Sequence, residues 1–133
     1  MSKKKLAIIG AIVAVVAIVM AVVFIPSEFE RVKNECKNIA GQVSTGKNYF
    51  MLDTNPYENA SESTRLILLP TTQENTLKAI KYANEALGFP GSVYSDMLET
   101  TALMGRQSVE NSKYTVSWTY HPDRGLEVTY TKK

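Results

Sequence analysis

The chain has 133 residues and a formal net charge of +2, from 15 basic and 13 acidic side chains. Lys3, Lys4 and Lys5 supply three of the basic residues, so the chain from Pro26 onward carries 12 basic against 13 acidic residues, a net charge of −1. This balance excludes the concentrated basic surface typical of nucleic-acid-binding proteins. The single cysteine excludes an internal disulfide framework, and the single histidine excludes a histidine-rich metal site.

The first predicted element is the apolar run Leu6 to Ile25, which contains no charged, amide or hydroxyl side chain. As a helix it is roughly 30 Å long, which matches the hydrocarbon core of a bilayer. The lysines before it lie in a short basic tail, residues 1–5, and mark the cytoplasmic side of a first span. The run therefore predicts a single-pass signal-anchor in a bacterial cell membrane, with everything after it outside the cytoplasm.

A cleaved signal peptide is the alternative interpretation of the same run. Val19-Met20-Ala21 places small or modest side chains at the usual cleavage positions. The run is longer than the apolar region of a signal peptide, about 7–15 residues, and no A-x-A sequence follows it. We therefore expect the segment to be retained as a membrane anchor.

Small residues line one seam of the predicted span: Ala7, Gly10, Ala14, Ala17 and Ala21. In lipid, helices associate where small residues let their backbones approach closely. The spacing of three and four residues favours a left-handed crossing of about +20°. The seam predicts a homodimer formed through the membrane span; the alternative is that it reflects the composition of the span and nothing more.

After the span, Ser27 and Glu30 form a capping-box pattern for a new helix. Apolar residues then recur at helical spacing, which predicts a juxtamembrane amphipathic helix over residues 26–46. Gly41 or Gly46 is expected to end it.

Residues 47–54 form a short apolar run that predicts a strand, followed by a polar loop over residues 55–64. Asp53 has the first spacing of a calcium loop, but the next ligand position and the glycine are missing. We interpret Asp53 as an Asx-turn residue, with metal binding as the alternative. Residues 65–69 are expected to form an edge strand stopped by Pro70.

Two helices are predicted next. Thr71 and Glu74 form a second capping-box pattern, and Gly88 has the C′ position of the first helix. The second helix is expected from Ser92 to Gly105, with Met97 on its apolar face. We expect this face to pack in the core; a methionine-lined groove is the functional alternative.

The C-terminal segment predicts a β-hairpin, because apolar and polar residues alternate on both sides of the turn His121 to Gly125. A slip of one residue would turn the apolar face toward polar side chains, so the register is well specified. The predicted cross-strand pairs are Tyr120 with Leu126, Trp118 with Val128, and Val116 with Tyr130.

The candidates for chemistry are Cys36, Asp53, Arg106, His121 and Asp123. Cys36 lies within an apolar stripe and is expected to be a small buried side chain. His121 and Asp123 share one turn and are expected to shape it, and Arg106 follows a helix end, where arginine usually interacts with the helix dipole. The sequence contains no phosphate-binding glycine loop, zinc-protease motif or nucleophile elbow, so we predict no catalytic, cofactor or metal site.

The sequence therefore predicts an α+β protein with one N-terminal transmembrane helix. An extracytoplasmic domain, residues 47–133, follows the juxtamembrane helix, and together they contain about three helices and a C-terminal hairpin. The expected function is a membrane-anchored, non-enzymatic binding or assembly module whose ligand the sequence does not identify. The alternative is a small secreted or anchored hydrolase or inhibitor that uses His121 with a carboxylate or with Cys36.

Overall fold

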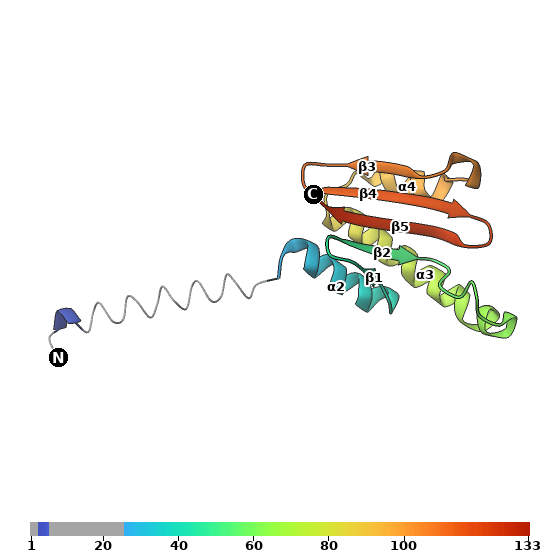
Figure 1. Ribbon diagram of the computed structural model, residues 1–133, viewed down its shortest axis with the longest axis horizontal. Coiled ribbons are helices and arrows are strands. Elements are labelled where there is room, and N and C mark those ends of the chain that lie inside the picture. The colour runs from blue at the N-terminus through green and yellow to red at the C-terminus, as the bar shows by residue number, and fades with distance from the viewer. Residues whose placement is uncertain (1–2, 6–25) are drawn as a thin grey trace.

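The computed structural model describes residues 3–5 and 26–133 of the chain. The predicted span Leu6–Ile25, with its seam of small residues, lies outside these described residues. Among the helices of the described part, none has the length and apolar character needed to cross a membrane. Residues 26–133 form an α+β domain with three α-helices, one short 3-10 helix and five antiparallel strands (Figure 1).

The elements follow one another as α2 (Glu28–Ala40), β1 (Ser44–Thr45), β2 (Tyr49–Asp53), α3 (Glu62–Ala86), α4 (Gly91–Glu99), η1 (Ala102–Met104), β3 (Gln107–Glu110), β4 (Tyr114–His121) and β5 (Gly125–Lys132). The sheet has the order β1-β2-β5-β4-β3, and every neighbouring pair is antiparallel. The α+β class is confirmed, and the expected strand over residues 47–54 is β2. The sheet is larger than predicted because β2 pairs along the outer side of the hairpin and β3 pairs along its other side.

The C-terminal hairpin is formed by β4 and β5, in the predicted register. Tyr120 pairs with Leu126, Trp118 with Val128 and Val116 with Tyr130. Gly125 has a φ of 76°, the left-handed conformation expected of the glycine that closes this turn. The alternation of apolar and polar residues therefore correctly predicts which face of these two strands is buried.

Helices α2, α3 and α4 cover one face of the sheet, as Figure 1 shows. The side chains that point from the strands toward these helices alternate along each strand with more exposed ones. Those buried on this face are Phe50, Leu52, Tyr114, Val116, Trp118, Leu126, Val128 and Tyr130.

Helix α2 begins as predicted, because the Ser27 hydroxyl accepts a hydrogen bond from the Glu30 amide at 3.2 Å. It ends at Ala40 with Gly41 in the left-handed conformation, φ 86°, so the first of the two expected glycines stops it. Phe29, on its buried face, lies 5.1 Å from the Phe50 ring. This helix therefore packs into the same hydrophobic core as the sheet.

Helix α3 corrects the expectation for residues 55–75. It begins at Glu62 and continues through Pro70, so the edge strand predicted over residues 65–69 is wrong. Ser61 caps its first turn, and its hydroxyl accepts from the Thr64 amide at 3.3 Å. Pro70 has no amide hydrogen and its ring crowds the carbonyl of Leu66, at a cost of about 3 kcal/mol, yet the helix capped at Ser61 continues across it.

Helix α4 also differs from its prediction, because it ends at Glu99 and not near Gly105. The Thr100 hydroxyl donates to the Asp96 carbonyl at 2.6 Å and accepts from the Trp118 indole at 2.8 Å. These two bonds hold the chain where it leaves the helix. Met97 is buried, which confirms core packing, whereas Met104 lies exposed on η1.

Candidate functional site

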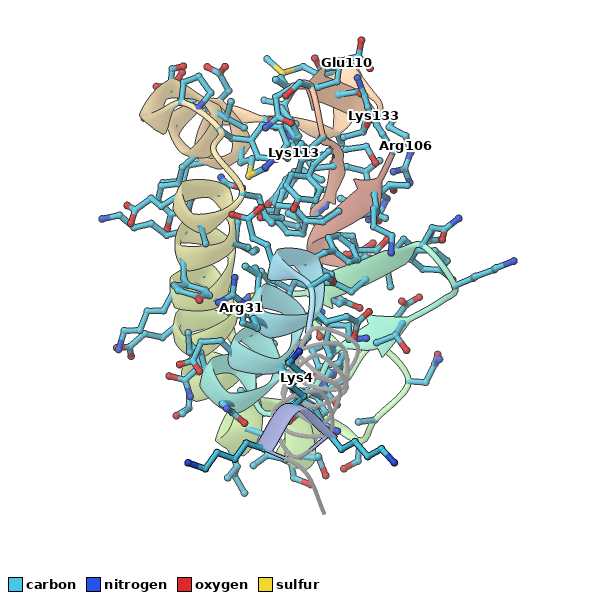
Figure 2. The ribbon with its side chains drawn as sticks, turned by 90° about the vertical axis from the view of Figure 1, so that its left-hand side faces the viewer. Lys4, Arg31, Arg106, Glu110, Lys113 and Lys133 are labelled. Carbon is cyan, nitrogen blue, oxygen red and sulfur yellow. The ribbon has the colours of Figure 1, made fainter. Side chains whose placement is uncertain are left out.

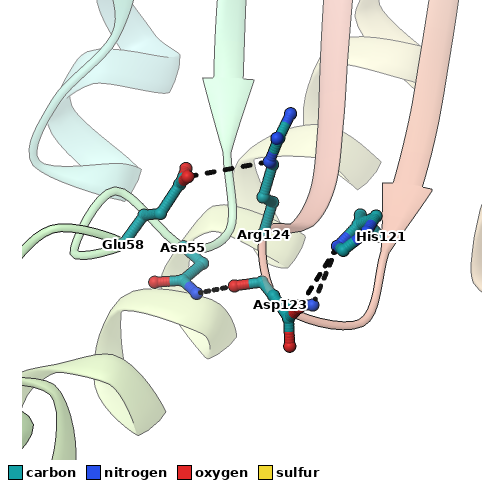
Figure 3. Close-up of polar contacts among 5 residues, drawn as sticks. All are labelled: Asn55, Glu58, His121, Asp123 and Arg124. Atoms are coloured by element: carbon teal, nitrogen blue, oxygen red, sulfur yellow. Dashed lines mark hydrogen bonds and ion pairs between the residues drawn. The ribbon is translucent and has the colours of Figure 1, made fainter.

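The turn between β4 and β5 contains His121 and Asp123, which the sequence singled out. The Nδ1 atom of His121 accepts from the Asp123 amide at 3.1 Å and lies 3.9 Å from its carboxylate, as drawn in Figure 3. The Asn55 amide donates to the Asp123 carbonyl at 3.0 Å, and Arg124 pairs with Glu58 at 3.6 Å. Both His121 and Asp123 are exposed. These contacts fix the turn and attach it to the loop after β2.

Cys36 lies in the core between α2 and α3, where its Sγ atom is 3.6 Å from the Ala79 carbonyl. Burial, followed by the nearby charge of Glu35, raises the pKa of its thiol to about 12. A thiol that stays protonated at neutral pH is a poor nucleophile. The expected buried side chain is confirmed, and among the described residues Cys36 bonds to Ala79 and His121 bonds to Asp123, not to each other.

Asp53 accepts a hydrogen bond from the Asn55 amide at 2.8 Å, which confirms the predicted Asx turn. Burial raises the pKa of its carboxyl group, and the bond from Asn55 partly opposes this. Within the described part of the chain, no three His, Cys, Asp or Glu side chains are arranged to hold a metal ion.

Arg106 precedes β3, and its guanidinium donates to the Ser117 hydroxyl on β4 at 3.0 Å. The residue thus reaches onto the face of the sheet that the helices leave open.

A groove lies between α3, α4 and the tip of the β4–β5 hairpin; the sequence indicated a methionine-lined groove only as the alternative to core packing, and Met97 is the methionine in this lining. Its first hollow measures about 320 Å³ and includes no charged residue among the described residues that line it. Its second hollow, about 310 Å³, continues along the N-terminal part of α3. The two hollows share Asn55, Leu69 and Gln73, so they adjoin along α3, and together they are called the groove here. The apolar lining of the first hollow consists of Leu69, Leu77, Met97, Leu98, Tyr120, Pro122 and Leu126.

Asn55 lies where the two hollows meet and is 8% exposed. Its side-chain nitrogen is used by Asp123, but its Oδ1 atom is buried without a hydrogen-bond partner. Among the described side chains, this is the single buried polar atom in that condition. An unmet buried acceptor costs about 1–3 kcal/mol, so a donor that reached this atom beneath the groove would be stabilising.

The N-terminal part of α3 adds an apolar ridge beside the groove, formed by Leu66, Ile67 and Leu68. Leu66 is 71% exposed and Ile67 is 74% exposed. The buried residues of α3 begin at Thr76, so the turns before it extend from the core with little cover. Figure 1 shows this part of α3 running out beyond β2. Large exposed apolar patches of this kind mark interaction surfaces.

The groove and the start of α2 lie at opposite ends of the domain. At one end, Tyr114 begins β4, and its hydroxyl donates to the Glu28 carboxylate of α2 at 2.6 Å. At the other end, Tyr120 lines the groove, six residues or about 20 Å along the strand. Figure 2 views the first of these ends, where Lys113 and Lys133 lie together and Lys133 pairs with Glu110 at 3.1 Å.

The expected interaction residues Ala7, Gly10, Ala14, Ala17 and Ala21 lie outside the described residues, so their seam stays a prediction. The groove residues were missed for two reasons. Asn55 begins the expected polar loop over residues 55–64, and Leu66 to Leu69 fall in the expected edge strand over residues 65–69. The capping pattern from Ser61 to Thr64 was the local signal that could have placed the apolar run on a helix.

Comparisons of this chain with protein-family models, with curated proteins and with solved structures find no match.

Proposed function

We propose that the chain is a membrane-anchored, non-enzymatic binding module. Its span is Leu6–Ile25, its N-terminus is cytoplasmic, and its α+β domain recruits a partner outside the cytoplasm. The observation that carries this proposal is the uncharged groove with its exposed ridge on α3. A monomeric soluble domain rarely leaves such apolar surface uncovered unless it binds something.

The position of the groove supports the same proposal. Helix α2 begins three residues after the predicted span, at the end of the domain opposite the groove. A domain tethered through α2 would therefore present the groove away from the bilayer, where a partner can approach. The Tyr114 hydroxyl bond to Glu28 ties the start of α2 to β4 and would limit how the domain tilts on its anchor.

The alternative of a hydrolase or inhibitor receives less support from the geometry. It requires His121 beside a nucleophile or a catalytic carboxylate. His121 contacts Asp123 of its own exposed turn, and Cys36 is buried with its thiol protonated. A general base needs a hydrogen bond to its nucleophile or to a bound water, whereas these contacts shape a turn.

The proposal is tested by photo-crosslinking in the membranes of the source organism. A photoreactive amino acid at Ile67, on the ridge, should give a discrete crosslinked species larger than the monomer. The matched control is Lys81, which is also exposed on α3 but lies on its core-packed C-terminal half. Leu69→Asp, which places a charge in the groove, should remove the species. Products at both positions alike, or none at Ile67, would contradict a binding role for this end of the domain.

A further inference from the structure

We propose that the occupant of the groove is a polypeptide segment that inserts an uncharged apolar side chain and donates a backbone N–H to the Oδ1 atom of Asn55. This inference rests on the proposed binding function and adds the chemistry of the partner. It follows from three features of the groove: its lining, its unmet acceptor and its two adjoining hollows.

The lining selects for an uncharged group. Leu69, Leu77, Met97 and Leu98 form the walls of the first hollow, and no described lining residue carries a charge. Placing a charge there would cost its hydration without an opposite charge to compensate. A leucine-like side chain instead gains about 25 cal/mol for each Å² of apolar surface that it buries.

The acceptor selects for a donor beside that apolar group. Asn55 Nδ2 is held by the Asp123 carbonyl, which orients the amide and leaves Oδ1 free to accept. The oxygen lies beneath the surface where the hollows meet, and the exposed Gln73 side chain lines both hollows there. The proposed complex therefore requires the surface over Oδ1 to open when the donor enters. A peptide N–H next to an apolar side chain supplies both groups at adjacent positions.

The two adjoining hollows favour an extended chain over a compact small molecule. The second hollow leads from Asn55 along α3 to Glu62 and Arg65, which carry opposite charges. A peptide seated in the first hollow can continue into the second, where polar backbone and charged side chains find partners. The ridge residue Leu66 lines this second hollow and would contact the continuing chain.

The test uses two probes that differ in one hydrogen-bond donor. N-methyl-4-methylpentanamide carries a leucine-like side chain beside one peptide N–H, and methyl 4-methylpentanoate has an ester oxygen in place of that N–H. Each is titrated into the full chain in nanodiscs, and the binding is followed by NMR signals of groove residues. We expect saturable shifts at Leu98 and Leu69 with both probes, and about fivefold tighter binding of the amide.

Variants assign the effect to the groove and to its acceptor. Leu98→Ser should weaken both probes, whereas the matched control Leu103→Ser, at a position that is 99% exposed outside the groove, should change neither. In Asn55→Ala the preference for the amide should disappear, because the acceptor has been removed. The comparison of amide and ester in the unaltered chain does not depend on whether this variant folds.

Equal binding of the two probes would overturn the role of Asn55. NMR shifts only outside the groove, or no shifts at all, would overturn the groove as the binding site. Groove signals that move on dilution without any probe would assign the groove to self-association of this chain, which contradicts the recruitment of a separate partner. Each of these results would contradict the inference. The crosslinking of Ile67 in native membranes is a separate measurement, so failure here and failure of the proposed function can be distinguished.

Discussion

Trp118 is the side chain whose removal should most clearly report the architecture of the domain. It is 3% exposed, and its indole nitrogen donates to the Thr100 hydroxyl at 2.8 Å in the interior. It therefore connects the middle of β4 to the residue that ends α4. Trp118→Ala removes the ring and this hydrogen bond together.

The expected cost follows from both losses. Truncation of a buried tryptophan to alanine costs about 3–5 kcal/mol in lost burial and in the cavity that remains. A domain of this size is stable by about 5–15 kcal/mol, so the variant should be near or below the limit of folding. Trp118→Phe is the matched control: it keeps an aromatic ring, loses the indole bond and should cost clearly less.

The measurement is urea unfolding of the full chain in nanodiscs, followed by circular dichroism of the domain. We expect the midpoint to fall strongly for Trp118→Ala and moderately for Trp118→Phe. An unchanged midpoint for Trp118→Ala would refute the packing of α4 against β4, because Trp118 would then be a surface residue.

Three further predictions concern the turn, a carboxyl group and the span. Gly125→Ala should destabilise the domain more than Gly105→Ala in the same urea assay: both glycines have positive φ, but an added Cβ meets a threonine hydroxyl at 2.5 Å at position 125 and open space at position 105. Because burial raises the pKa of Asp53 above its value of 3.8 in the unfolded chain, unfolding free energy should increase as pH falls through the folded pKa toward 3.8, and Asp53→Asn should flatten that dependence. Gly10→Leu should weaken self-association in a membrane two-hybrid assay, whereas Val13→Leu should not. Equal behaviour of the two variants would mean that the row of small residues reflects only the composition of the span.

The hairpin could be predicted because its information is local. Its alternation, its turn residues and its register lie within one continuous segment, and Trp118 opposite Val128 follows directly from counting. The place of β2 beside β5 is not local, since the two strands are separated by three helices and two strands. Sequence pattern indicated that β2 exists but not which strand it would join.

The groove could not be predicted because it depends on two outcomes that local patterns left undecided. The run Leu66 to Leu69 suits either a strand or a helix, and the cap at Ser61 decides between them. Asp123, far along the chain, holds the amide nitrogen of Asn55, and no described group donates to the buried amide oxygen. The lack of a partner for the Asn55 Oδ1 atom is thus a property of the tertiary structure.

The most direct test of the account measures where the groove lies and whether it is occupied. Leu98→Cys, in the groove, and Leu103→Cys, outside it, are each introduced with Cys36→Ala and treated with a membrane-impermeant maleimide. Both positions are exposed, so in the purified chain the two should react at similar rates. In intact cells we predict that both react from outside and that Leu98→Cys reacts several times more slowly, because a partner covers it. Reaction only after the membrane is opened would contradict the topology, and equal rates in cells would contradict an occupied groove.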